Sequence, residues 1–288
     1  MFTMEIGLIM LFIVLMVVYD WLKSRRLLSG LHKKAVFITG CDSGFGNALA
    51  KSLYTRGVPV FAGCLLKTSA TKLQEETGNS LRTVIIDVTD KDSVTRAAQY
   101  VKDNLPDDSV LWGLVNNAGV LDYLAPLEFL DKRDFLHLLD VNLFGTLEVT
   151  KAFLSMLKWS KGRIVNMTSI NADVSIAAFG AYTVSKRAAQ AFSDTLRLEQ
   201  AAWGIKVSAI KPAFYKTNII SSEMVEEKMT RKWNEGSPEV KLEYGEGCLN
   251  KGYDAKFTRC LTFLGSTVVD RFMSRAMKFE PKLMQSDQ

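Results

Sequence analysis

The hydrophobic positions of this 288-residue chain fall into three patterns. Residues 1–22 form a nearly continuous apolar run, residues 35–212 alternate short apolar runs with longer amphipathic stretches, and the periodicity weakens over residues 213–288. Short strands that alternate with helices of about ten residues or more predict an α/β fold with a doubly wound parallel sheet. The patterns therefore predict an N-terminal segment, one central domain and a C-terminal region that is built differently.

The apolar runs of the central domain predict six strands, at residues 35–39, 58–64, 83–86, 111–115, 162–167 and 206–210. The amphipathic stretches predict helices at residues 47–55, 91–104, 132–159 and 181–203. Beyond these, residues 217–244 are charged and helical in character, as a lid over the carboxyl edge of a sheet would be. Residues 257–277 have the apolar spacing of an amphipathic helix. With 48% hydrophobic residues the chain can bury a large core, so one α/β domain is expected.

The apolar run at residues 1–22 predicts a membrane anchor. Glu5 and Asp20 are its only charged residues, and its length matches the roughly 20 residues that cross a bilayer as a helix. Tyr19 and Trp21 lie where aromatic side chains meet the membrane interface, and the linker at residues 23–34 is basic. A secretory signal would carry its positive charge before the apolar run. We expect an uncleaved anchor with the following domain on the cytosolic side; a hairpin-like monotopic insertion is the alternative.

Charge and cysteine spacing argue against several other classes of function. The net charge of +5 is dispersed, so no nucleic-acid partner is expected. The four cysteines have neither metal-ligand nor disulfide spacing, which predicts reduced thiols. The two histidines, His32 and His137, are too few for a histidine metal site or a conventional triad. We therefore expect no metal, and we interpret His137 as a helix-surface or packing residue.

A glycine-rich turn follows the first predicted strand and precedes a helix. Glycines allow a tight turn there and let backbone N–H groups approach a pyrophosphate at the helix N-terminus. An ordinary strand–helix turn is the alternative. Residues 116–119 read Asn-Asn-Ala-Gly after the fourth strand, which suits a backbone that passes close beneath a cofactor. The candidate cofactor contacts of the first turn are Gly40, Asp42, Ser43, Gly44, Phe45 and Gly46.

Tyr182 and Lys186 are the candidate pair for acid–base chemistry. They are four residues apart in a predicted helix, so they lie on one face of it. A phenol titrates near pH ~10, and an ammonium held beside it lowers that pKa toward the working range. Ser169 follows the fifth strand, where its hydroxyl could polarise a carbonyl group. Asn142 interrupts a predicted helix, which indicates either a specific hydrogen bond or a solvent-facing position.

These motifs, taken together and in this order, resemble the short-chain dehydrogenases/reductases. The segments 39–46 and 111–119 are similar to the retinol/hydroxysteroid dehydrogenase branch of that family, and membrane-bound 3-hydroxybutyrate dehydrogenase is a close neighbour. The resemblance covers residues 34–217 and implies a Rossmann-like sheet of six to seven strands. It is carried by Thr39-Gly40-x-x-x-Gly44-x-Gly46, Asn116-Asn117-Ala118-Gly119, Asn142, Ser169 and Tyr182-x-x-x-Lys186.

The family implies a role for each of these residues. Tyr182 would be the general acid/base, Lys186 would lower its pKa and bind the nicotinamide ribose, and Ser169 would hold the substrate oxygen. Asn142 would support a water relay behind the lysine. The other implied cofactor contacts, beside Tyr182 and Lys186 themselves, are Asp87, Val88, Asn117, Ala118, Gly119, Pro212 and Thr217.

Two departures from the family pattern concern the region after the sixth strand. Residues 212–213 are Pro-Ala where relatives usually have Pro-Gly, so a methyl group would crowd the nicotinamide edge. Residues 246–254 are much shorter than the part of relatives that supplies the rest of the lid, a helix and a seventh strand. We therefore expect a dinucleotide-binding catalytic domain at residues 35–212, and a shortened lid with a C-terminal helix at residues 213–288. The sixth strand would be an exposed edge, and the last helix would cover it, pack in the core or lie on the membrane.

The sequence thus predicts a membrane-anchored oxidoreductase that transfers a hydride between a nicotinamide cofactor and a lipophilic secondary or allylic alcohol or its carbonyl, a retinoid or hydroxysteroid. The alternatives are a 3-hydroxybutyrate-type dehydrogenase and a cofactor-binding form without catalysis. NAD is expected because Asp42 would repel a 2′-phosphate, although Lys67 could meet one and NADP stays open. The expected location is the endoplasmic reticulum membrane, with a mitochondrial membrane as the alternative, and a homodimer stays open.

Overall fold

A sheet of six parallel strands, in the order β3-β2-β1-β4-β5-β6, forms the centre of the protein. The computed structural model describes residues 29–213 except 79 and 177, residues 222–244, and residues 10, 12, 14–16, 18 and 19. The predicted doubly wound parallel sheet is confirmed, and each predicted strand forms with small shifts at its ends. The strands are β1 (Lys34–Ile38), β2 (Val60–Cys64), β3 (Arg82–Ile85), β4 (Val110–Asn116), β5 (Arg163–Met167) and β6 (Lys206–Ile210).

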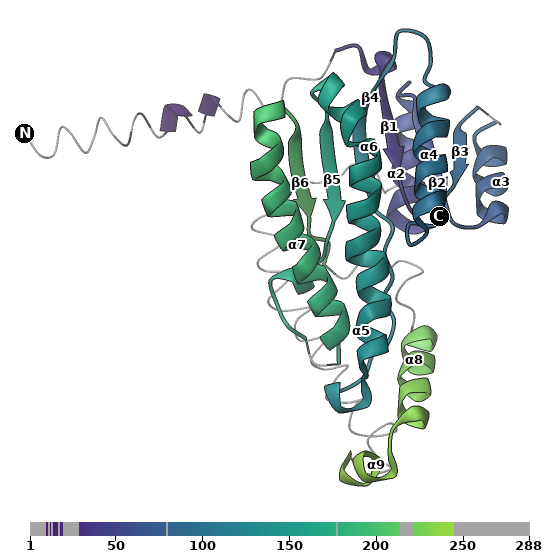
Figure 1. Cartoon of the computed structure of the whole chain (residues 1–288), viewed down its shortest axis with the longest axis vertical. Coiled ribbons are helices and arrows are strands. Elements are labelled where there is room, and N and C mark those ends of the chain that lie inside the picture. Colours follow the sequence, from purple (N-terminus) through teal and green to yellow (C-terminus); the bar gives the residue numbers. More distant parts are fainter. Residues whose placement is uncertain are drawn as a thin grey trace, which may run out of the picture.

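Helices cover both faces of this sheet (Figure 1). Consecutive residues of β1 point to the two layers. Phe37 packs into the core beneath the helices at residues 91–103, 146–160 and 180–200, whereas Ile38 packs into the core beneath the helices at residues 44–55 and 67–76. Because both faces are covered, the central strands are apolar on both sides, as parallel strands usually are. The helices are α2 (Gly44–Thr55), α3 (Lys67–Glu76), α4 (Lys91–Asp103), α5 (Lys132–Leu139), α6 (Thr146–Ser160), α7 (Gly180–Gln200), α8 (Ser222–Glu235) and α9 (Pro238–Tyr244).

The single helix predicted at residues 132–159 is divided in the structure. A π-helical turn, Asp140–Gly145, separates α5 from α6. Gly145 lies against Val88, and a β-carbon at residue 145 would lie 2.7 Å from Val88 Cγ2. A π turn adds a residue to the helical repeat and is frequent at functional sites. Apolar spacing does not reveal such an insertion, because the pattern on either side of it stays helical.

Helix α3 has no counterpart in the sequence prediction. Most of its residues are polar, and only Ala70 and Leu73 are buried. Two buried positions give too short an apolar stripe for a periodicity argument. Helices α8 and α9 occupy the segment that was predicted to be a charged, helical lid.

Strand β6 is the edge of the sheet within the described part of the chain. It pairs with β5, and Lys206, Ser208 and Ile210 are exposed. Val207, between them, is buried in the core with α7. The described residues therefore agree with the expected six strands and open edge.

Three predictions lie wholly or mostly outside the described residues. They are the anchor at residues 1–22, the helix at residues 257–277 and the cofactor contact Thr217. Among the residues that are described, we find no helix with the length and apolar character needed to span a bilayer.

Candidate active site

The candidate site lies at the carboxyl edge of the sheet, where the strand order reverses. Strand β1 has β2 on one side and β4 on the other, so the strand order reverses between β1 and β4, and in sheets of this kind a crevice outside the carboxyl ends of the strands marks that point. Ligands of open α/β sheets bind at this switch point. The glycine-rich turn follows β1 and the Asn-Asn-Ala-Gly segment follows β4, so both motifs reach the crevice.

The glycine turn approaches the β4 loop more closely than a side chain would allow. Gly40 has a left-handed φ of 68°, and a β-carbon there would lie 2.8 Å from Ala118 Cα. Gly46, in the first turn of α2, would place a β-carbon 2.5 Å from Asn117 Nδ2 and against the Gly40 carbonyl oxygen. These contacts require glycine. At Gly44, which begins α2, no described atom lies within 4 Å of where a β-carbon would be, so a phosphate has room there, as dinucleotide binding requires.

Hydrogen bonds fix the two loops to each other. Thr39 Oγ1 accepts hydrogen bonds from the backbone N–H groups of Asn117 and Ala118, both at 3.0 Å. Asn117 Nδ2 donates in return to the carbonyl oxygens of Thr39, at 2.9 Å, and Gly40, at 3.0 Å. Sequence reasoning quoted Thr39 only as part of a motif and missed this role, which its place directly after β1 could have indicated.

Asp42 belongs to the glycine turn, and its carboxylate lies at the end of β2. Its two carboxylate oxygens accept hydrogen bonds from the backbone N–H groups of Leu65 and Leu66, each at 2.9 Å. Burial, and secondarily Asp42, raise the pKa of the neighbouring Cys64 thiol to about 12. Asp87, further along the same edge, accepts hydrogen bonds from the N–H and hydroxyl groups of Thr89.

Ser169, Tyr182 and Lys186 meet beyond β5. Lys186 Nζ lies 5.7 Å from the centroid of the Tyr182 ring, and the Ser169 hydroxyl is near enough to the phenol to influence its pKa. Lys186 Nζ donates to the Met167 carbonyl oxygen at 3.1 Å, and burial lowers its pKa from 10.5 to about 8. Burial raises the pKa of Tyr182 above its usual value of 10, and this outweighs the lowering caused by Ser169. The Tyr182 pKa therefore lies above its usual value, whereas the sequence predicts a lowered one.

Asn142 joins this group from the π-helical turn. Its Nδ2 donates to the Val120 carbonyl oxygen and to Ser185 Oγ, both at 3.0 Å, and its Oδ1 accepts from Val120 N–H at 2.9 Å. Ser185 Oγ donates to the Tyr182 carbonyl oxygen at 2.8 Å. A β-carbon at Gly119 would lie 3.0 Å from Asn142 Oδ1 and 3.2 Å from Lys186 Nζ. Asn142 is thus buried at the site rather than facing solvent, and Ser185 is a linking residue that the sequence reasoning missed.

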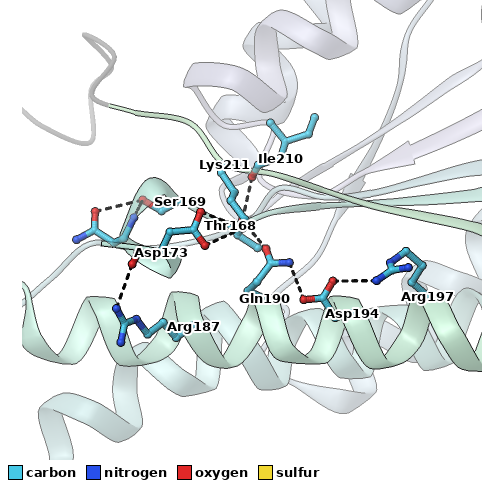
Figure 2. A network of polar contacts seen from close by, with 10 residues as sticks. Thr168, Ser169, Asp173, Arg187, Gln190, Asp194, Arg197, Ile210 and Lys211 are labelled. Atoms are coloured by element: carbon cyan, nitrogen blue, oxygen red, sulfur yellow. Dashed lines mark hydrogen bonds and ion pairs between the residues drawn. The ribbon is translucent and has the colours of Figure 1, made fainter. Parts of the chain in front are cut away.

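Further polar contacts hold Ser169 in place. Asn171, which was not predicted, donates its backbone N–H to Ser169 Oγ at 3.2 Å and accepts from that hydroxyl at 3.3 Å through its Oδ1. The segment after Ser169 is attached to the chain after β6. Lys211 Nζ lies 2.8 Å from the Asp173 carboxylate (Figure 2). Ile170 N–H also donates to the Pro212 carbonyl oxygen. Pro212 therefore lies beside the candidate catalytic serine.

An apolar cluster lines the site next to Tyr182. One of its members, Met229, comes from helix α8, so this helix closes over the cluster. Two ion pairs place α8 there: Lys228 Nζ lies 2.8 Å from Asp122 Oδ1, and the buried pair Lys232–Asp134 has a distance of 2.7 Å. The cluster consists of Leu121, Leu124, Ile176, Ala178 and Phe179, with Tyr182 and Met229 packed against it.

Comparisons with known proteins agree with this geometry. Residues 34–228 match the family model described as short chain dehydrogenase. The human protein named retinol dehydrogenase 16 is 45% identical over 235 residues, which are 82% of this chain and 74% of that protein. The rat protein named 17-beta-hydroxysteroid dehydrogenase type 6 is 43% identical over 226 residues, 78% of this chain and 71% of that protein. The solved structure of an NAD+-bound xylitol dehydrogenase has a TM-score of 0.63 and 26% identity, and the match covers 73% of this chain and 80% of that one.

Proposed function

The chain belongs to the short-chain dehydrogenase family, and from that premise we propose that it interconverts a lipophilic alcohol and its carbonyl compound with NAD at a membrane surface. Dehydrogenase activity follows from the family. Substrate class, cofactor choice and membrane attachment are the proposal. The observation that carries the proposed substrate class is the apolar cluster that surrounds Tyr182 and is closed by Met229.

The proposed mechanism uses the chain's own residues to move a proton. A bound nicotinamide would accept a hydride from the alcohol or supply one to the carbonyl. Ser169 and Tyr182, which lie near each other beyond β5, would hold the substrate oxygen between their hydroxyl groups. Tyr182 would donate its proton to that oxygen during reduction and take the alcohol proton during oxidation. Lys186 and Asn142, which meet beside Gly119, would hold the ribose side of the cofactor and support a water relay.

The position of Asp42 supports NAD. Folds of this kind that bind NAD commonly present an acid near the end of the second strand to the ribose 2′-hydroxyl. Here the strand itself ends without an acid, but the Asp42 carboxylate is held at that place by Leu65 and Leu66. A 2′-phosphate would approach this charge closely and be repelled. Lys67, which begins α3 and is exposed, is the residue that would favour NADP instead.

Membrane attachment is proposed from the sequence of residues 1–22 together with the apolar site. An anchor would hold the domain beside a phase that dissolves retinoids and hydroxysteroids, as the names of the similar human and rat proteins suggest for the substrate. The basic residues that follow would keep the domain on the cytosolic side, and we propose the endoplasmic reticulum as the location.

Turnover of a substrate panel tests this proposal. Purified full-length chain is assayed with all-trans retinol, a hydroxysteroid and 3-hydroxybutyrate, each with NAD and with NADP. We expect kcat/KM at least about tenfold higher for one of the lipophilic alcohols than for 3-hydroxybutyrate, and about tenfold higher with NAD than with NADP. A preference for 3-hydroxybutyrate would contradict the substrate class, and a tenfold preference for NADP would contradict the role of Asp42. Cofactor binding without turnover of any alcohol would contradict catalysis.

A further inference from the structure

Exposed tryptophan and lysine side chains gather at the end of the domain opposite the candidate active site. We call this the amino-edge surface and define it as Lys158, Trp159, Lys161, Leu198, Trp203 and Lys206. Trp159 is 84%, Leu198 70% and Trp203 54% exposed. Figure 1 shows the amino ends of β5 and β6 at one end of the molecule and helices α8 and α9 beyond their carboxyl ends.

Contacts join four members of this surface, Lys158, Lys161, Trp203 and Lys206. Lys158 Nζ lies 4.0 Å from the centroid of the Trp203 ring. A β-carbon at Gly204 would lie 3.5 Å from the Lys161 side chain, and Lys206 N–H donates to the Gly162 carbonyl oxygen at 3.1 Å. The last turns of α6 and α7 and the first residues of β5 and β6 therefore present one patch.

A second aromatic group lies next to it. Trp112, on the strand adjacent to β5, has the Arg163 guanidinium 4.0 Å from its ring centroid and Lys34 Nζ 5.5 Å from it. Lys34 begins β1, so the basic linker and the apolar run at residues 1–22 join the domain at this same edge. Aromatic side chains beside lysines and arginines are the chemistry of a membrane interface, where rings lie among headgroups and cations meet anionic lipid.

Among the described residues, none forms an ion pair with the lysines of the amino-edge surface, Lys158, Lys161 and Lys206. Acidic residues do occur at this end: Glu199 is exposed, and Asp108 pairs with Lys33 at 3.5 Å. The three lysines are nevertheless available for an external anion.

We propose that the amino-edge surface lies on the headgroups of an anionic bilayer. This inference rests on the proposed membrane attachment and adds an orientation to it. The three lysines contact anionic lipid, Trp159, Trp203 and Leu198 enter the interface, and the carboxyl edge with Tyr182 faces away from the bilayer.

Fluorescence quenching tests this orientation in the full-length chain. Cys248→Ser and Cys260→Ser leave Cys41 and Cys64, which are both buried. A cysteine-reactive dye is then attached after Leu198→Cys or, as the matched control at the carboxyl edge, after Leu127→Cys; the native leucines are 70% and 64% exposed. The chain is reconstituted into phosphatidylcholine vesicles with or without phosphatidylserine, and the quencher is a spin label at the lipid headgroup.

We expect the dye at position 198 to be quenched at least about twofold more than the dye at position 127, and more strongly with phosphatidylserine than without it. Lys158→Gln, Lys161→Gln and Lys206→Gln together should abolish the dependence on phosphatidylserine. Equal quenching at both positions in a chain that floats with the vesicles would overturn the orientation while leaving the anchor intact. A chain that does not float would overturn the proposed attachment itself. Self-quenching between dyes at position 198 without lipid quenching would mark a second copy of the chain as the partner and also overturn the proposal.

Discussion

Burial determines the protonation of the two residues proposed to carry the chemistry. It lowers the pKa of Lys186 to about 8 and raises the pKa of Tyr182, so both side chains are shifted toward their neutral forms. Their spacing in the sequence correctly predicted that they share one helix face. It could not predict that the lysine ammonium would donate to the Met167 carbonyl oxygen, because that contact comes from a strand distant in sequence.

The depressed pKa of Lys186 predicts an unusual dependence of stability on pH. Below pH 8 the lysine is charged in both the folded and the unfolded chain, and the full cost of burying the ammonium, roughly 3 kcal/mol for this shift, is present. Between pH 8 and 10.5 the folded chain loses this proton while the unfolded chain keeps it. The unfolded state then binds more protons, so the free energy of unfolding rises with pH over this window.

The measurement is the free energy of unfolding of the wild type and Lys186→Met between pH 7 and pH 10. We expect the wild type to gain stability relative to the variant as pH rises through 8, by up to about 3 kcal/mol. Lys102→Met, at an exposed position on α4, is the control and should give a constant difference. A constant difference for Lys186→Met as well would show that the ammonium is not buried as the structure describes.

Among the secondary-structure elements, α8 depends most on charge for its position. The Lys232–Asp134 pair is buried, so removing the lysine leaves a carboxylate without its partner, a change that typically costs about 3–5 kcal/mol. Trp233 also stacks on Phe129, with ring centroids 5.4 Å apart. Because α8 contributes Met229 to the apolar cluster, loosening this helix should weaken substrate binding.

We expect Lys232→Met to raise KM for the lipophilic substrate several-fold while the dissociation constant of the cofactor stays unchanged. Adding Asp134→Asn removes the unpaired charge and keeps an acceptor for Asp131 N–H, so the double variant should recover much of the loss. Lys102→Met, at an exposed position on α4, is the control. Equal KM values in all variants would show that α8 does not close the site.

The elements also show where sequence patterns stop being informative. The six strands could be predicted from apolar runs, because parallel strands that are buried on both faces have near-continuous apolar sequences. The π-helical turn at Asp140–Gly145 left none; Asn142 within it indicated only a specific hydrogen bond or a solvent-facing position. Asn171 and Ser185 act by holding Ser169 and Asn142, and a residue whose role is to position another gives no motif of its own.

For the whole molecule, the order of the strands places the candidate site residues that the structure describes at one edge of the sheet. The sequence could predict this because the glycine turn, the amide loop and the tyrosine helix each follow a strand. The two ends of the molecule differ in chemistry. The carboxyl edge holds the apolar cluster with Tyr182, and the amino edge holds exposed tryptophans and lysines. That second surface forms only when residues distant in sequence meet, so no local pattern could show it.

The central claim is that Tyr182 transfers the proton in a nicotinamide-dependent oxidation of an alcohol. Tyr182→Phe removes the phenolic hydroxyl and keeps the ring that packs against the apolar cluster. Tyr100→Phe, on α4 in the packing beside Phe61, is the matched control. We expect kcat of Tyr182→Phe to fall by about 10²-fold or more, with an unchanged dissociation constant for NAD, while the control keeps wild-type values. Full turnover by Tyr182→Phe would contradict the account.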